Sequence, residues 1–207
     1  MGEKSILNAF LFILAGYLSG SVLYAQIFAR LFGHQNLTEI SHDHNPGTAN
    51  AFHYCGFGCG VLTLVCDLLK GFLPVSLFMT TAEQPPYACA LVMAAPVIGH
   101  TFSVFDHFHG GKGIAVTFGC LLGLFPIWQP FALLAFYFIV FSVVLTISPD
   151  YYRTLAAYLC ALAIIPFAVE RVEICQGFLL LSFAVLFRLL TSKEEKAQLE
   201  VKWLWMH

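Results

Sequence analysis

The chain has 207 residues, of which 59% are hydrophobic and only 11% are charged, and its mean hydropathy is +0.79. A soluble domain carries about 25% charged residues, so this composition indicates an integral membrane protein and excludes a separate soluble domain. The formal net charge of -2 offers no basic surface for nucleic acid. We therefore expect an all-α helical bundle that forms a single integral membrane domain over residues 1–207.

Apolar runs predict about seven membrane helices, because backbone groups in lipid must form their hydrogen bonds within the segment. The first run begins at Ile6 and continues past Tyr24 without a small-residue cleavage site, which is typical of a retained span and not of a removed signal peptide. The seven predicted spans lie near 6–28, 57–80, 86–104, 113–127, 129–148, 154–170 and 174–190. Some are short or contain proline, so a count of five or six stays open.

The distribution of Lys and Arg predicts the orientation of the bundle. With the N-terminus outside, the inner segments hold Arg30, Lys112, Arg153, Arg188, Lys193, Lys196 and Lys202, and the outer segments hold only Lys4 and Arg171. We therefore expect cytoplasmic segments at 29–56, 105–112 and 149–153, and a cytoplasmic C-terminal tail over 191–207. Residues 192–200 of this tail are charged and predict a helical stretch.

Two small residues in the first span, Gly20 and Ser21, are a candidate part of a site. Small residues also allow two helices to pack closely, and this alternative stays open.

A polar segment, residues 41–51, precedes the second span. Its Asn-Pro-Gly sequence from Asn45 to Gly47 predicts a turn followed by the start of a helix. Thr48 and Asn50 can donate hydrogen bonds to an anionic or hydroxylated ligand, although the same residue types also cap ordinary helices.

The second span contains two ionisable residues, Asp67 and Lys70, followed by Gly71. Side chains three positions apart lie on one face of a helix and can neutralise each other. Ionisable groups within a membrane are costly and mark functional sites more often than not. A structural ion pair is the alternative, and Lys70 could instead extend toward an anion.

The segment from Gly99 to Gly113 gives the strongest indication of function. It contains His100, at the end of the third span, and then Gly110, Gly111, Lys112 and Gly113 directly before a new apolar run. Successive glycines allow backbone N–H groups to face an anion, a helix start favours negative charge, and Lys112 adds a positive charge. The sequence therefore predicts a phosphate cradle at the membrane surface, with His100 as either a site residue or a structural one.

Histidine and aspartate also cluster near these motifs, and they raise the question of a metal. The residues are His42, Asp43, His44, His53, Asp106, His107 and His109. Imidazole and carboxylate groups suit zinc or iron. No helical His-Glu-x-x-His pattern is present, so we predict no metal, and a metal-dependent membrane enzyme is kept as an alternative.

Taken together, these motifs resemble those of the bacterial acyl-phosphate:glycerol-3-phosphate acyltransferases, a family of small seven-span inner-membrane enzymes. The likeness extends over about residues 10–125. It is carried by Asn45-x-Gly47-x-x-Asn50, by Asp67-x-x-Lys70-Gly71, and by Gly99-His100 followed by Gly110-Gly111-Lys112-Gly113, with Gly20-Ser21 in the first span.

The family transfers a fatty acyl group from acyl phosphate to the first hydroxyl of glycerol 3-phosphate, and it is not known to need a metal or other cofactor. The resemblance implies the same substrates, a location in the bacterial inner membrane among its lipids, and a monomeric chain. It implies catalytic roles for Ser21, Asn50, Lys70, His100 and Lys112. It implies phosphate-binding roles for Asn45, Gly47, Thr48, Asp67, Gly110, Gly111 and Gly113.

The mechanism that the resemblance favours is direct attack of the acceptor hydroxyl on the acyl carbon. No Ser-His-Asp triad is evident in the sequence, so an acyl-enzyme is the more complicated alternative. A substrate phosphate would then act as the base.

Several positions depart from the family pattern. Glu39 replaces an arginine, and His42-Asp43-His44 replaces Gly-Ser-Gly. The family's Arg-Tyr-Val-Ser-Leu becomes the segment from Tyr151 to Leu155, and its C-terminal His-Arg-x-Asn has no counterpart near Arg188. A lost phosphate-binding arginine removes charge-assisted hydrogen bonds. A different acceptor or an inactive protein therefore stays open, with Arg153 and Arg188 as candidates to replace the arginine.

Another class of function is open as well. Intramembrane Asp67, Lys70 and His100 would suit an anion or proton pathway in a transporter. The paired, inverted halves typical of transporters are not evident in the sequence, so acyl transfer is our preferred reading.

Overall fold

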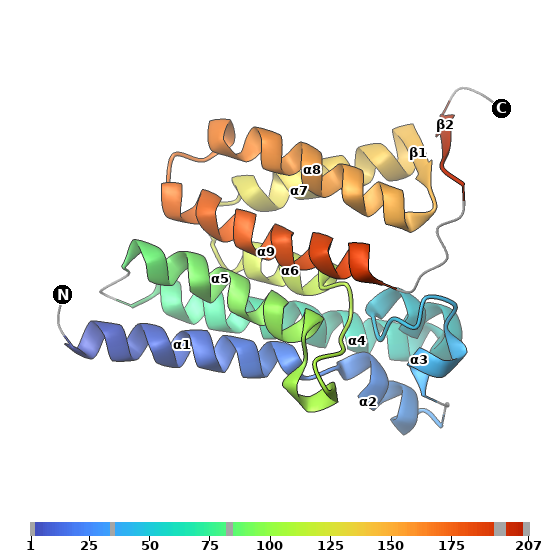
Figure 1. Ribbon diagram of the computed structural model, residues 1–207, viewed down its shortest axis with the longest axis horizontal. Coiled ribbons are helices and arrows are strands. Elements are labelled where there is room, and N and C mark those ends of the chain that lie inside the picture. Colours follow the sequence, from blue (N-terminus) through green and yellow to red (C-terminus); the bar gives the residue numbers. More distant parts are fainter. Residues whose placement is uncertain (1–2, 34–35, 82–84, 193–197, 205–207) are drawn as a thin grey trace.

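The computed structural model describes residues 3–33, 36–81, 85–192 and 198–204 and consists mostly of packed helices (Figure 1). The α-helices are α1 (Glu3–Ser21), α2 (Tyr24–Leu31), α3 (Leu37–Ile40), α4 (Thr48–Met79), α5 (Pro86–Thr101), α6 (Ile114–Leu122), α7 (Gln129–Ile139), α8 (Asp150–Ala168) and α9 (Val172–Thr191). A 3-10 turn, η1 (Val104–Asp106), a π-helical segment, η2 (Val140–Val144), and two strands, β1 (Leu145–Ser148) and β2 (Glu200–Trp203), complete the described elements.

Five helical segments in the described part of the chain are long and apolar enough to cross a membrane. They are Lys4–Leu31, Thr48–Met79, Pro86–Asp106, Asp150–Ala168 and Val172–Thr191. Each of the seven predicted spans contains a helix, but α6 has only 9 residues, a length of about 14 Å against a hydrocarbon core of about 30 Å. The prediction of a helical membrane protein is confirmed, whereas the count of seven spans is not.

Backbone breaks interrupt the helices of the first two predicted spans. The second span is predicted from residue 57. Helix α4 begins earlier, at Thr48, but it is kinked at Gly56, whose φ of 86° and ψ of 173° are not helical and favour glycine, so the predicted start coincides with this kink. The first predicted span is divided into α1 and α2 at Val22 and Leu23.

A small β-ribbon corrects the all-α expectation. Strand β1 pairs antiparallel with β2, so that Leu145 faces Trp203 and Ser148 faces Glu200. The fifth predicted span, expected to run to residue 148, therefore ends in β1. The predicted tail helix over 192–200 is wrong at Glu200, which begins β2, and its residues 193–197 lie outside the described part of the chain. The strand contains Thr146 and Ile147, β-branched residues that favour extended backbone.

Glycines bring the long helices into close contact. Helix α1 packs against α5, α5 against α9, and α4 against α6. A Cβ atom on Gly20 would overlap the Pro96 carbonyl of α5, and one on Gly119 would overlap the Leu68 carbonyl of α4. Since two apolar helices gain no hydrophobic energy by leaving lipid for each other, such close packing is a main source of their stability. The small-residue alternative is thus supported for Gly20.

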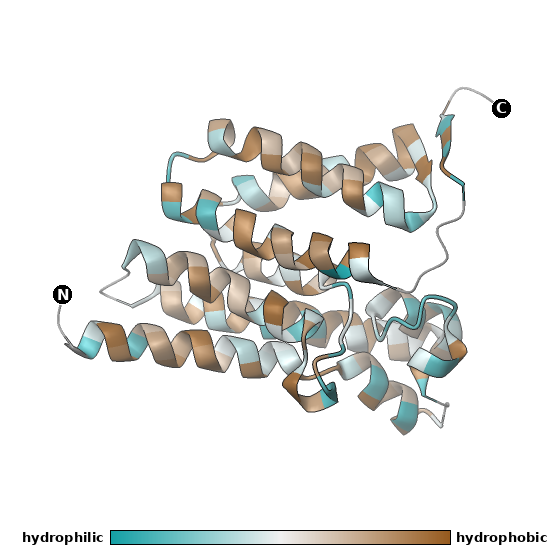
Figure 2. Ribbon diagram, in the orientation of Figure 1, coloured by the Kyte–Doolittle hydropathy of each residue, from teal (hydrophilic) through white to brown (hydrophobic). Residues whose placement is uncertain are grey.

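The polar connections gather at one end of the bundle. Helices α2 and α3, the turn before α4, the loop after η1 and the β-ribbon all lie at the right-hand end in Figure 1. Hydrophilic residues concentrate in these connections, and hydrophobic residues dominate the long helices (Figure 2). All segments predicted to be cytoplasmic and described by the structure therefore share one end, while the side of the membrane that this end faces stays a prediction.

The close contact at Gly119 predicts a sensitive position. Gly119→Ala should lower the free energy of unfolding by about 1–3 kcal/mol, because the added methyl group must push α6 away from α4. Thermal unfolding in detergent measures the effect. Gly58→Ala is the matched control, since its Cβ would make only ordinary contact with Phe32. Equal midpoints for the two variants would contradict a tight α4–α6 interface.

Candidate anion-binding site

The glycine loop is anchored to the end of α5. The Gly111 N–H donates to the His100 carbonyl at 3.0 Å. A Cβ on Gly110 would overlap that same carbonyl, and Gly113 has a φ of 81° directly before α6. Glycine is needed here for the close approach and the left-handed conformation. The prediction of a cradle made by successive N–H groups is therefore wrong at Gly111, whose N–H already has a partner in the protein.

The turn before α4 is held by hydrogen bonds among its own residues. The Asn50 side chain donates from Nδ2 to the Asn45 carbonyl at 2.8 Å and to Asp43 Oδ1 at 2.6 Å. The Asn45 N–H also donates to Asp43 Oδ1, at 3.2 Å. The N-cap residue of α4 is Gly47, without a side-chain capping bond. Asn50 thus fixes the turn and does not act as an ordinary helix cap.

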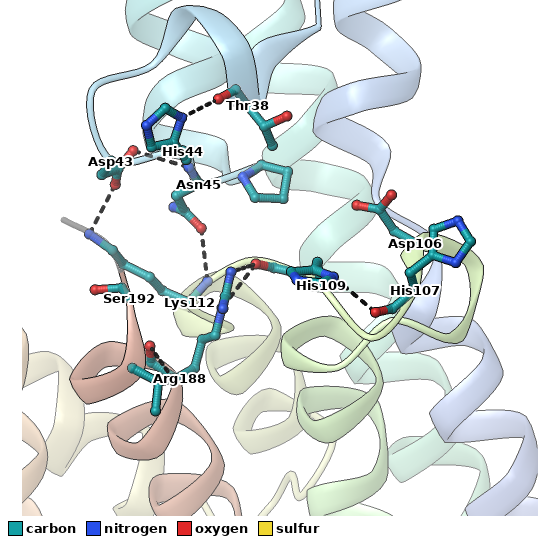
Figure 3. A pocket seen from close by; sticks show the side chains of 13 residues that line it. Thr38, Asp43, His44, Asn45, Asp106, His107, His109, Lys112, Arg188 and Ser192 are labelled. Atoms are coloured by element: carbon teal, nitrogen blue, oxygen red, sulfur yellow. Dashed lines mark hydrogen bonds and ion pairs between the residues drawn. The ribbon is translucent and has the colours of Figure 1, made fainter.

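The loop and the turn meet at Lys112. Its backbone N–H donates to Asn45 Oδ1 at 3.1 Å, and its Nζ atom lies 3.1 Å from Asp43 Oδ2. Figure 3 shows both contacts, with the turn on one side and Lys112 on the other. The two segments that the sequence predicts to form one site are therefore adjacent in space.

A buried charged cluster lies in the helices near this junction. Lys70 Nζ lies 2.8 Å from Asp67 Oδ1 and 2.8 Å from His100 Nδ1, and it donates to the Val22 carbonyl at 2.6 Å. Asp67 also accepts a hydrogen bond from Thr48 Oγ1 at 3.1 Å. The opposite charges of Lys70 and Asp67 thus compensate each other, which is the condition for keeping charges out of water. A structural role therefore accounts for Lys70, whose hydrogen bond to the Val22 carbonyl stabilises the break between α1 and α2.

Both candidate arginines line cavities beside the turn. Arg188 of α9 donates to the Gly110 carbonyl from Nε at 3.1 Å and from Nη2 at 2.8 Å. Arg153 of α8 pairs with Asp150, with 2.6 Å between Nη2 and Oδ1. Arg188 and Arg153 each line a cavity that the turn also lines, and a phosphate-binding role for either stays a prediction.

Two cavities share the Asp43–Lys112 pair. The first, here the loop cavity, has a volume of about 620 Å³, and its lining includes Thr38, His44, Asp106, His107, His109, Gly110, Arg188, Thr191 and Ser192 (Figure 3). The second, here the helix cavity, has a volume of about 630 Å³. Its polar lining includes Asn50, Asp67, His100, Asp150 and Arg153, and its apolar lining includes Phe52, Leu64, Ile114, Phe118 and Phe138. Asp43, Asn45 and Lys112 line both.

The structure brings most of the predicted site residues together. The helix cavity is lined by Asn45, Gly47, Thr48, Asn50, Asp67, His100, Lys112 and Gly113, and the loop cavity by Gly110. Ser21, Lys70 and Gly111 line neither cavity. Ser21 donates to the Tyr17 carbonyl at 2.9 Å, within α1. Sequence reasoning left Asp43 and Asp150 out of the site, although Asp43 stands next to the Asn-Pro-Gly turn.

Metal ligation finds no geometric support. Within the described ranges, no group of three His, Cys, Asp or Glu side chains is placed to hold a metal ion. The histidines serve other contacts: His44 Nδ1 lies 2.7 Å from the Thr38 carbonyl, and the His53 ring packs edge-on against Tyr54.

The bundle and its polar end define an integral membrane protein with a candidate anion site at one end. The sequence profile of the family named glycerol-3-phosphate acyltransferase matches residues 10–199, a longer part of the chain than the motifs cover. The chain therefore belongs to the glycerol-3-phosphate acyltransferase family.

Individual relatives agree with this assignment. The glycerol-3-phosphate acyltransferase of Legionella pneumophila (strain Corby) is 43% identical over 110 residues, which are 53% of this chain and 39% of the relative. That of Desulfovibrio desulfuricans is 40% identical over 119 residues, which are 58% of this chain and 52% of the relative. In these comparisons the chain spans about half or less of the length of the curated relatives it matches.

A solved structure has the same fold. The glycerol 3-phosphate form of PlsY, an integral membrane glycerol 3-phosphate acyltransferase, superposes with a TM-score of 0.76 at 23% identity, covering 87% of this chain and 88% of that one.

The buried cluster predicts a strong effect on stability. Lys70→Met should destabilise the protein by about 3–5 kcal/mol, because it leaves the Asp67 carboxylate buried without its ion pair. The double variant Lys70→Met/Asp67→Leu should recover part of that loss. Unfolding curves in detergent check both values, and a single variant as stable as the unmodified chain would contradict the structural role of Lys70.

Proposed function

We propose that this chain transfers a fatty acyl group from acyl phosphate to the first hydroxyl of glycerol 3-phosphate, as a step of phospholipid synthesis. The observation that carries the proposal is the position of Lys112, which Asn45 holds in the wall shared by two cavities. Family membership points to the same reaction. The relative whose structure is solved in its glycerol 3-phosphate form supports a phosphorylated acceptor.

The helix cavity suits a substrate with an apolar chain and an anionic head. Phe118, Phe138 and Leu64 line its apolar part, and Lys112 and Arg153 supply positive charge in its polar part. Apolar walls stabilise an acyl chain by removing it from water, while cationic groups form charge-assisted hydrogen bonds with phosphate. A site among membrane helices brings such a chain and a polar acceptor together.

Direct attack of the acceptor is the mechanism that these residues favour. The acceptor oxygen bonds to the acyl carbon, the bond from that carbon to the phosphate oxygen breaks, and inorganic phosphate leaves. The hydroxyl proton passes to a phosphate oxygen of a substrate. His100 fits this route, since Lys70 Nζ already contacts its Nδ1 atom at 2.8 Å.

The charged residues would act mainly by position and electrostatics. Lys112 and Arg153 would balance the negative charge of the phosphates and of the oxyanion that develops at the acyl carbon. The rigid turn, held by Asn45 and Asn50, would keep these groups in place before the substrates arrive, so that orientation costs less during the reaction.

The same proposal includes the cellular setting. We infer a location in the bacterial inner membrane, with the N-terminus outside and the two cavities open toward the cytoplasm. The charge distribution supports this orientation, because the segments at the cavity end hold most of the Lys and Arg residues of the connections.

An activity assay with purified protein tests the reaction. Palmitoyl phosphate and labelled glycerol 3-phosphate in detergent should give labelled lysophosphatidic acid and one inorganic phosphate for each molecule of lysolipid. Lys112→Ala should reduce turnover by about 100-fold or more, because it removes positive charge from the reacting centre.

Lys202→Ala is the matched control, since this lysine is largely exposed and lines neither cavity. It should keep turnover close to that of the unmodified chain. The proposed function is contradicted if the folded protein forms no lysolipid, or if Lys112→Ala retains full turnover. Transport of labelled glycerol 3-phosphate into proteoliposomes without lysolipid would favour the transporter.

A further inference from the structure

Asp43 occupies a position that a bound phosphate would be expected to take. Its carboxylate receives Lys112 Nζ at 3.1 Å, Asn50 Nδ2 at 2.6 Å and the Asn45 N–H at 3.2 Å. An ammonium group, a side-chain amide and a backbone N–H form the kind of donor set that holds phosphate oxygens in proteins. These three donors therefore form an anion site, and the Asp43 carboxylate of the same chain occupies it.

Partial burial strengthens the attraction between Asp43 and Lys112. The side chains of Lys112 and Asp43 are only 13% and 16% exposed, so their attraction is screened less than that of a surface pair. Asp43 lines both cavities. A phosphate that enters either cavity is repelled by the negative charge of Asp43. To bind Lys112, it must share the lysine with Asp43 or displace the carboxylate.

We propose that Asp43 is a specificity-determining residue, whose carboxylate competes with a substrate phosphate for Lys112 and thereby lowers the preference for phosphorylated over neutral substrates. The predicted effect on substrate preference rests on the proposed acyl transfer, whereas the predicted effect on phosphate binding does not. A role as general base fits poorly, because Lys112, Asn50 and the Asn45 N–H already occupy both carboxylate oxygens. The competing ligand is a phosphate monoester or an acyl phosphate, which carry the same dianionic group.

Binding of inorganic phosphate and of glycerol 3-phosphate to the full chain in detergent, measured by calorimetry, tests the competition. Asp43→Asn should bind both about tenfold more tightly, because it removes the competing charge and keeps an acceptor for Asn50. Asp43→Ser should show the same direction, and Asp43→Glu, which keeps the charge, should stay near the unmodified chain.

Glu39→Gln is the matched control. It removes the same charge at the same end of the bundle, but Glu39 is exposed and lines neither cavity. Its phosphate affinity should change by less than about twofold.

Kinetics identify which phosphate is involved. In Asp43→Asn a lower KM for glycerol 3-phosphate assigns the competition to the acceptor, and a lower KM for palmitoyl phosphate assigns it to the donor. If the acceptor is involved, the ratio of kcat/KM for glycerol 3-phosphate to that for glycerol should rise about tenfold.

Failure of this inference and failure of the proposed function give different results. Unchanged or weaker phosphate binding in folded Asp43→Asn and Asp43→Ser overturns the inference, even if turnover is normal. Absence of turnover with tighter phosphate binding in both variants overturns the acyl transfer and supports the competition. Each variant is shown to be folded if its thermal unfolding midpoint equals that of the unmodified chain.

Discussion

The hydrogen bond from the Lys112 N–H to the Asn45 side chain joins two segments that are 67 positions apart in the sequence. The turn before α4 and the loop before α6 both depend on it for their relative position, and the two cavities meet beside it. Because the bond uses a backbone N–H, it fixes the path of the loop, while the lysine side chain pairs with Asp43. Arg188, which donates to Gly110, secures the same loop from α9.

The helices below provide a rigid base for this junction. The Lys70–Asp67–His100 cluster connects α4 with α5 and with the break after α1, and all three residues are almost completely buried. Such a cluster is costly to form and also costly to leave half-complete, so it favours one arrangement of the helix ends. Close glycine contacts between α1 and α5 and between α4 and α6 hold the helices that carry these side chains.

The sequence predicts the long elements well and the tertiary contacts poorly. Helices α5, α8 and α9 lie within a few residues of their predicted spans, because apolar length is a local property. The β-ribbon escaped prediction because β1 finds its partner beyond α9. The turn and loop were predictable from their Asn and Gly residues. The approach of Arg153 and Arg188 follows from helix packing, and so does the contact of Asp43 with Lys112, which no local pattern contains.

The most direct test of the anion site is an experimental structure of the chain with glycerol 3-phosphate bound. The account predicts phosphate oxygens within about 3 Å of Lys112 Nζ, with the Lys112–Asn45 bond intact. A phosphate bound at another end of the bundle, or a structure in which the turn and the loop are separated, would contradict it.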